Sequence, residues 1–322
     1  NMTLQSEVDI LEDHLVRNGV VIFQGLGKFI SSTEVEVKTL LGDTSVITAD
    51  RVIIAVGTKT FRPDYVPFDG KAVIDSDEVT RMKTLPRSMT VIGAGVVGVE
   101  YATIFSTLDI NVTLVEPRNT MLDFIDSEVL MHFRHDIVDQ GLRLQFGQKV
   151  SKIERRKSGT CVVHLESNRA MASDMILFAA GRVGATDNLG LEKIGVEVDH
   201  RKRLAVNENF QTNVPNVYAV GDVIGFPSLA STSLEQGRAA ALHALGCEVH
   251  QLPEFFPYGI YAVPEMSSVG MTEEEVIKRK ISYEVGIVPL PETSRGKVMG
   301  LQSGLMKLIF STKSRRLLGA QA

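Results

Sequence analysis

The stretch from Thr90 to Glu116 constrains the fold of this chain more than any other part of the sequence. A β-branched run at 90–92 leads into a glycine turn, an apolar-periodic helix follows, and a second short strand at 112–115 ends on Glu116. The turn reads Gly93-Ala94-Gly95-Val96-Val97-Gly98. Strand, glycine turn, helix, strand and terminal acid, in this order, predict a βαβ unit of the kind that binds a dinucleotide.

Each glycine of the turn has its own physical task in such a unit. Gly93 permits the tight strand-to-helix turn, Gly95 lets the backbone approach a pyrophosphate, and Gly98 lets helix and strand pack closely. The helix N-terminus presents N–H groups and a positive dipole end to the phosphates. The carboxylate of Glu116 is placed to accept hydrogen bonds from both hydroxyls of an adenosine ribose. We therefore expect dinucleotide binding, and the alternative is a glycine-rich turn in another kind of α/β protein.

Length, charge and cysteine content narrow the class of protein. The 322 residues, 44% of them hydrophobic, are enough for two or three domains with proper cores. A net charge of −5 argues against nucleic acid or an anionic membrane as the main partner. No apolar run approaches the roughly 18 residues that a spanning helix needs. Cys161 and Cys247 are isolated and suit a reducing compartment, so we expect a cytoplasmic protein.

Apolar periodicity and breaks at glycine and proline predict further helices and strands. A helix is expected over residues 3–18, a second from its cap at Asp126 to Gly141, and a third over 228–245. Strands are expected at 20–24, 34–38, 45–48, 51–55, 175–180, 216–222 and 305–310. Because strand–turn–helix units lie on both sides of the dinucleotide unit, we expect one α/β domain to be inserted in another.

Several ordered motifs make the chain resemble the two-dinucleotide flavoprotein disulfide reductases. The matching segments are Ala55–Thr58, Gly93–Glu100, Gly181-Arg182, Tyr218–Val223 and Tyr261–Gly270. The resemblance covers essentially the whole chain. It implies FAD, NAD and NADP as cofactors, and a homodimer for the full-length protein.

The same resemblance implies an α/β fold in which a Rossmann-like NAD(P)-binding domain is inserted in a partial FAD-binding domain. The FAD-binding domain would comprise residues 1–86 and 200–250, and the NAD(P)-binding domain residues 87–199. The start of an α+β dimerisation domain would occupy residues 251–322.

The two ends of the sequence lead us to expect a piece of a longer protein. It opens on Asn1-Met2 and stops soon after the apolar run at 305–310, with no helix or capping signal to close that segment. The first glycine fingerprint of the FAD-binding domain would precede residue 1, and most of the interface domain would follow residue 322. We therefore expect weak FAD binding, or none, in this fragment.

Three segments match family residues around the flavin. Asp222 matches the acid that hydrogen-bonds the FAD ribityl chain, and a helix-capping aspartate is the alternative. The run Ser228-Leu229-Ala230-Ser231 would begin a helix whose dipole faces the flavin pyrimidine edge. The strand-then-glycine turn Val56-Gly57-Thr58 is a further cofactor-binding segment.

Four residues match family positions around the nicotinamide coenzyme. Glu100 matches the glutamate beside the reactive flavin nitrogen and is the expected catalytic residue, with a solvated helix residue as the alternative. Val96 stands where some relatives have a tyrosine that gates the nicotinamide pocket. Val150 matches an adenine contact, with a core valine as the alternative. Gly181 matches a glycine whose backbone lies near the nicotinamide.

Two departures favour the transhydrogenase branch of the family over the dihydrolipoamide dehydrogenase branch. The latter usually has a histidine where Ser231 stands, and a Pro-Asn pair where Val183-Gly184 follows Gly181-Arg182. The implied reaction is hydride transfer between NAD(H) and NADP(H) through FAD. One alternative is a dihydrolipoamide dehydrogenase-like, NAD-dependent flavoprotein. The other is a fragment that acts only as a nucleotide-binding module without activity.

Use of both coenzymes requires a site that tolerates a ribose with or without a 2′-phosphate. Glu116 suits the free hydroxyls of NADH and repels the 2′-phosphate of NADPH. Arg118 follows two residues later, where its guanidinium could pair with that phosphate. The alternative is that Arg118 is a solvated loop residue.

A metal site is not expected. His132 and His135 are three residues apart on the helix that starts at Asp126, so they could share a ligand. The sequence offers no third ligand, and a solvent-facing helix explains the pair.

Overall fold

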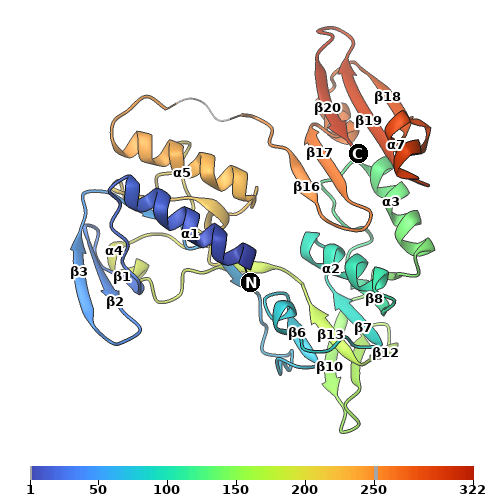
Figure 1. Cartoon of the computed structure of the whole chain (residues 1–322), viewed down its shortest axis with the longest axis horizontal. Coiled ribbons are helices and arrows are strands. Elements are labelled where there is room, and N and C mark those ends of the chain that lie inside the picture. The colour runs from blue at the N-terminus through green and yellow to red at the C-terminus, as the bar shows by residue number, and fades with distance from the viewer. Residues whose placement is uncertain (1, 250–252) are drawn as a thin grey trace. The chain divides into compact units, whose positions relative to one another are not determined.

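The computed structural model describes residues 2–249 and 253–322, and the chain divides into two compact units (Figure 1). Unit 1 comprises residues 1–58 and 184–252, and unit 2 comprises residues 59–183 and 253–322. The boundary expected between residues 250 and 251 lies outside the described residues. No helix among the residues that the structure describes is long and apolar enough to cross a membrane.

Unit 1 combines helices with two small sheets. The strand order is β1-β2-β3 in an antiparallel sheet, and β15 pairs with β4 in parallel. A core that includes Ile54, Leu204 and Val217 holds these elements together. The elements are α1 (Met2–Arg17), β1 (Leu26–Ser31), β2 (Glu34–Lys38), β3 (Thr44–Thr48), β4 (Val52–Ile54), α4 (Leu191–Ile194), β15 (Val217–Ala219), η2 (Gly221–Ile224) and α5 (Ala230–Ala244).

Two expectations for unit 1 need correction. The apolar run at 20–24 forms no strand, and within the described chain the first strand is β1. A strand requires a neighbour to complete its hydrogen bonds, whereas Val20 donates back to Leu15 of α1 and Val21 is 72% exposed. The strand expected at 216–222 ends at Ala219, so Asp222 lies in the one-turn helix η2.

Unit 2 is built around a five-stranded, all-parallel sheet of order β6-β13-β7-β8-β9. Its central strands, β13, β7 and β8, are largely buried, as is usual for a parallel sheet that is covered on both faces. The elements are β6 (Val73–Asp75), η1 (Val79–Arg81), β7 (Ser88–Ile92), α2 (Val96–Thr107), β8 (Asn111–Glu116), α3 (Ser127–Asp139), β9 (Arg143–Phe146) and β13 (Met175–Phe178). The expected strand–turn–helix–strand unit is therefore confirmed as β7, α2 and β8.

Two smaller sheets accompany the parallel sheet. An antiparallel sheet of order β10-β11-β12 comprises Val150–Arg155, Cys161–Leu165 and Ala170–Ser173. The strands β5 (Thr58–Thr60) and β14 (Arg182–Gly184), where the chain enters and leaves residues 59–183, form a two-stranded sheet.

The C-terminal part of unit 2 is a five-stranded antiparallel sheet of order β16-β17-β20-β19-β18. Two of its core residues, Ile260 and Leu305, belong to the same apolar cluster as Val129 of α3. Figure 1 accordingly shows α3 beside this sheet. The elements are β16 (Tyr258–Ile260), β17 (Met266–Gly270), α6 (Glu273–Lys278), β18 (Tyr283–Pro289), η3 (Leu290–Glu292), α7 (Ser294–Met299), β19 (Leu305–Ser311) and β20 (Leu317–Gln321).

A buried lysine also joins the two parts of unit 2. Lys307 of β19 is 1% exposed, and its Nζ donates to Asp126 at 2.9 Å and to Glu273 at 2.5 Å. Glu128 completes the ion-pair cluster at 3.0 Å. Burial alone would lower the pKa of Lys307, but the three carboxylates outweigh it and raise that pKa well above its usual value. The cluster therefore holds the start of α3 against β19 and α6.

Candidate dinucleotide-binding site

The glycine turn lies at the carboxyl end of β7, and two of its glycines are required by the protein's own packing. Gly93 has φ +104°, and a Cβ there would stand 2.6 Å from the carbonyl oxygen of Ala179. A Cβ at Gly98 would stand 1.8 Å from the carbonyl oxygen of Gly93. A side chain at either position would therefore force the turn, helix α2 or the end of β13 to move.

Gly95 differs from both of these glycines. Its φ of −78° suits any residue, and a Cβ built on it meets no atom within 4 Å among the described residues. Gly95 is the N-cap of α2, and Val96 and Val97, which follow it, are half-buried. The space beside Gly95 thus lies at the positive end of a twelve-residue helix, where an anion is favoured.

Glu116 ends β8 and is 3% exposed. Its Oε2 accepts the N–H of Ala94 at 2.7 Å, and its Oε1 accepts Nε–H of Arg118 at 2.8 Å and the Arg118 backbone N–H at 3.1 Å. Burial alone would raise the pKa of Glu116, but the hydrogen bonds from Arg118 and Ala94 outweigh it and lower that pKa. Glu116 therefore stays ionised and ties the glycine turn to the second strand.

Arg118 lies between two carboxylates. In addition to its contact with Glu116, its Nη1 donates to Oδ2 of Asp123 at 3.0 Å. The hydrogen bond that Arg118 donates to Glu116 is the largest of the influences that raise the pKa of Arg118, so its guanidinium carries a full charge. Sequence reasoning did not single out Asp123. Its spacing of five residues from Arg118 was the available signal, but nothing in the sequence specified that the loop folds back.

Gly181 comes next to the glycine turn because β13 and β7 are neighbours in the sheet. Phe178 of β13 pairs with Ile92 of β7. Gly181 follows Phe178 by three residues, and the glycine turn follows Ile92. Gly181 has φ +121°, a backbone conformation that favours glycine, and its carbonyl accepts the N–H of Phe61 at 3.1 Å. From β7 the chain continues outward through β8 and β9, and it then returns to β13 on the other side of β7. Ligands of such sheets usually bind where the strand order reverses in this way, beyond the carboxyl ends of β7 and β13.

Glu100 and Val150 have partners within unit 2. Oε1 of Glu100 accepts the N–H of Tyr261 at 2.9 Å, in the loop after β16, and Thr103 accepts the N–H of Val263 at 3.0 Å. Helix α2 thus carries both the glycine turn and contacts to the C-terminal part of unit 2. Val150, at the start of β10, is half-buried against the apolar cluster around Ile153.

The segments matched to flavin contacts lie in unit 1. Because β4 and β15 are parallel neighbours, Gly57 and Asp222 follow the same edge of a two-stranded sheet. Gly57 has φ +66° and accepts the N–H of Ala185 at 3.0 Å. Gln236 of α5 accepts the N–H of Gly221 at 2.8 Å, so α5 packs on the turn that carries Asp222. Helix α5 begins at Ala230 and has Leu229 as its N-cap, and the hydroxyl of Ser228 donates to the Gly225 carbonyl at 3.0 Å.

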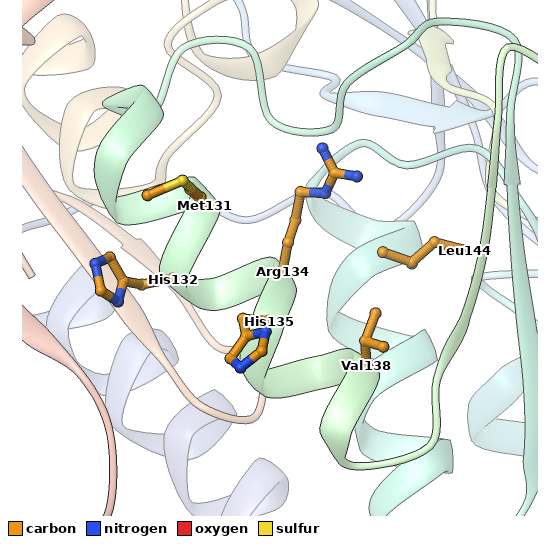
Figure 2. A pocket seen from close by; sticks show the side chains of 6 residues that line it. All are labelled: Met131, His132, Arg134, His135, Val138 and Leu144. Atoms are coloured by element: carbon orange, nitrogen blue, oxygen red, sulfur yellow. The ribbon is translucent and has the colours of Figure 1, made fainter.

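The histidine pair lines a separate surface hollow of about 590 Å³ on α3 and β9. Figure 2 shows His132 and His135 projecting from α3 while Arg134 reaches to the other side. His135 pairs with Asp139 at 3.4 Å, and Arg134 stacks over Phe146. Across the described parts of the chain, no three His, Cys, Asp or Glu side chains are grouped as metal ligands.

Cys161 is a buried residue of β11. Its Sγ donates to the carbonyl of Ala72 at 3.6 Å, and burial raises the pKa of its thiol. A buried, protonated thiol is unreactive.

Comparison with known proteins gives two family matches and close relatives. Residues 3–237 match the family described as pyridine nucleotide-disulphide oxidoreductase, and residues 256–322 match the dimerisation domain of the same family. The soluble pyridine nucleotide transhydrogenase of Mycobacterium tuberculosis is 44% identical over 314 residues, which cover 97% of this chain and 67% of that relative. The enzyme of the same name from Marinomonas sp. is 39% identical over 319 residues, covering 99% of this chain and 68% of the relative.

Solved structures share the fold over almost the whole chain. LpdA from Mycobacterium tuberculosis superposes with a TM-score of 0.93 at 24% identity, over 99% of this chain and 71% of that protein. The HOCl-induced flavoprotein disulfide reductase RclA from Escherichia coli gives a TM-score of 0.87 at 27% identity, over 98% of this chain and 73% of that protein. The expected α/β fold with a dimerisation domain is thereby confirmed.

Proposed function

The chain belongs to the pyridine nucleotide-disulphide oxidoreductase family, and from this premise we propose that it transfers hydride between NAD(H) and NADP(H) through FAD. Relatives named soluble pyridine nucleotide transhydrogenase support this reaction, since they match 94–99% of the chain at 38–44% identity. The flavin and nicotinamide supply the hydride chemistry when bound. The protein's own part is to bind the two dinucleotides, orient them and exclude water.

The contrast among the three turn glycines is the observation that supports dinucleotide binding. Gly93 and Gly98 are explained by contacts within the protein, whereas Gly95 is not. A glycine without an internal reason, at the positive end of α2, fits close approach of a pyrophosphate. We propose that Gly93 to Gly98 hold the pyrophosphate, Glu116 and Arg118 the adenosine ribose, and Gly181 and Val150 the two ends of the coenzyme.

A substitution at Gly95 tests this proposal because the protein itself has room for a side chain there. Gly95→Val should leave the fold intact and raise the NADH dissociation constant by about tenfold or more, since one decade corresponds to about 1.4 kcal/mol. Fluorescence titration measures the affinity, and circular dichroism checks the fold.

The matched control is Gly237→Ala in α5, compared with Gly95→Ala. Gly237 is another glycine whose Cβ would meet no described atom within 4 Å. Gly95→Ala should weaken NADH binding, and Gly237→Ala should leave the affinity unchanged. If correctly folded Gly95→Val protein binds NADH as tightly as the original, the pyrophosphate site is wrongly assigned.

For the flavin, we propose a site that uses the segments after β4 and β15. Their parallel pairing supports this, because ligands bind beyond the carboxyl ends of such strands. Val56-Gly57-Thr58 and Asp222 would contact FAD, and the N-terminus of α5 at 228–231 would face the ring. Separately, we propose Glu100 of unit 2 as the catalytic residue, with its carboxylate held by the N–H of Tyr261.

We further propose that the protein acts as a cytoplasmic homodimer. The match of residues 256–322 to a dimerisation domain supports self-association, and two isolated cysteines suit a reducing compartment. Light scattering during size-exclusion chromatography should give twice the monomer mass for the full-length protein. A monomer at micromolar concentration would contradict the proposal.

A further inference from the structure

We infer that Asp123 sets the preference between NADH and NADPH by competing with the 2′-phosphate for Arg118. This inference rests on the coenzyme site proposed above, in which the adenosine ribose lies over the end of β8.

The geometry around Arg118 is asymmetric. On one side Glu116 is buried and also holds the N–H of Ala94, so it is part of the folded turn. On the other side Asp123 is 60% exposed, and Arg118 itself is 46% exposed. A ligand that needs the guanidinium will therefore displace the exposed partner, Asp123, far more readily than the buried one.

The charge of this trio affects the two coenzymes differently. Two carboxylates and one guanidinium give Glu116, Arg118 and Asp123 a formal charge of about −1 at neutral pH. The 2′-phosphate of NADPH carries about −1.5 to −2 charges, and the ribose hydroxyls of NADH carry none. The 2′-phosphate must therefore overcome repulsion from Asp123 and replace Asp123 as the acceptor of the hydrogen bond from Nη1 of Arg118. The ribose hydroxyls of NADH are neutral, so their binding requires neither change.

Asp123 is held in this position by the residues around it. Leu122 is buried, has φ +45°, and its N–H donates to the carbonyl of Ala94 at 3.4 Å. Ile125 donates to Leu122 at 2.9 Å, and Asp126 then caps α3 and pairs with Lys307. The loop that carries Asp123 is thus anchored to the glycine turn at one end and to a buried ion pair at the other.

The decisive experiment replaces Asp123 with its neutral isostere. In Asp123→Asn protein the dissociation constant for NADPH should fall by roughly threefold or more, the size expected when an exposed ion pair no longer competes. The affinity for NADH should stay within about twofold. Calorimetry with 2′,5′-ADP and 5′-AMP isolates the ribose end, and the gain should appear with 2′,5′-ADP alone.

The matched control is Asp109→Asn. Asp109 lies in the turn between α2 and β8, at the opposite edge of the same sheet, and its φ of +60° is one that asparagine tolerates. The substitution removes the same charge as Asp123→Asn, but at a position away from the ribose end. The affinities for NADH and NADPH should therefore both stay unchanged. An equal gain for NADPH in Asp109→Asn protein would assign the effect to net charge and overturn the inference.

A double substitution separates competition from simple repulsion. On an Arg118→Ala background there is no guanidinium to compete for, so Asp123→Asn should lose most of its effect on NADPH. An undiminished gain there, unchanged NADPH affinity in the single variant, or an equal gain for NADH would each overturn the inference. If the unmodified protein binds neither NADH nor NADPH, the proposed function itself fails, which is a distinguishable result.

Discussion

Arg118 is the residue at which the two coenzymes are expected to diverge. Its guanidinium is partly exposed, fully charged and already aligned by the buried carboxylate of Glu116. A planar guanidinium held in this way is suited to bidentate recognition of a phosphate.

Removing this side chain should separate the coenzymes. In the full-length protein Arg118→Ala should weaken NADPH binding by about tenfold or more, because a charge-assisted contact of roughly 1.5–3 kcal/mol is lost. NADH affinity should be nearly unchanged. Parallel titrations with both coenzymes measure the difference, and equal losses for the two would contradict a shared site that distinguishes them at the ribose.

At this scale the sequence predicted the separate tasks of Gly93 and Gly98, since steric demands follow directly from a glycine turn between strand and helix. It did not predict that both carboxylate oxygens of Glu116 accept hydrogen bonds from within the protein. Those bonds depend on how the carboxylate folds back to Ala94, 22 residues earlier, which local pattern does not specify. The contact between Arg118 and Asp123 escaped prediction for the same reason.

Among the elements, α3 carries the most concentrated interactions. Asp126 is its N-cap, accepting the N–H of Glu128 at 3.1 Å, and the same side chain pairs with the buried Lys307. Asp126 thus accepts a hydrogen bond from a free N–H group at the start of α3, and it also pairs with a lysine that lies 181 positions later in the chain.

Two substitutions at Asp126 separate these roles. Asp126→Ala removes both the cap and the ion pair, and it should destabilise the protein by about 3–5 kcal/mol because Lys307 loses a buried partner. Asp126→Asn keeps a good capping residue, so it should cost about 1 kcal/mol less. Urea denaturation measures both, with Asp139→Asn at the exposed end of α3 as a control that should change little. Equal losses for the two variants at Asp126 would show that capping contributes nothing there.

Helical periodicity predicted α1, α3 and α5 because each has apolar positions at the right spacing or a clear cap. The strand expected at 20–24 was wrong for a physical reason. A run such as Val20–Phe23 favours extended backbone. A strand forms only where another strand completes its hydrogen bonds, and the local sequence does not indicate whether such a neighbour is present.

At the scale of the whole molecule, carboxylates of unit 2 link its stability to pH. Burial alone would raise the pKa of Glu116, but Arg118 lowers it. In the same way burial would raise the pKa of Asp75, but Arg62 lowers it. Lys307 lowers the pKa of Glu273. Groups with a lowered pKa contribute stability above their unfolded values, 4.5 for glutamate and 3.8 for aspartate. That contribution is lost as the pH falls through the folded values.

Lys307 makes stability depend on pH in the opposite direction, because its pKa is raised above the unfolded value of 10.5. Its contribution is present below that pH and is lost as the pH rises through the folded value. We expect the free energy of unfolding to be nearly flat between about pH 5 and pH 10 and to fall steeply below about pH 4.5. Urea midpoints from below about pH 4.5 to above about pH 10 test the prediction. A Lys307→Met variant should show a weaker alkaline decline, and a stability maximum near pH 4 would contradict the assignment.

The resemblance of ordered motifs predicted the α/β class and the dimerisation domain, both of which are confirmed. It could not predict that residues 59–183 and 253–322 form one compact unit. That union depends on Lys307 and on the bond from Tyr261 to Glu100, which are contacts between distant segments rather than features of any motif.

The buried lysine also has a consequence for synthesis on the ribosome. Asp126 leaves the translation machinery 181 residues ahead of Lys307, an interval of roughly ten to forty seconds at common elongation rates. Throughout that interval Asp126 and Glu128 lack the cation that later pairs with them, and the apolar residues of α3 lack Leu305. The segment from β7 to α3 therefore completes its packing only when β19 arrives.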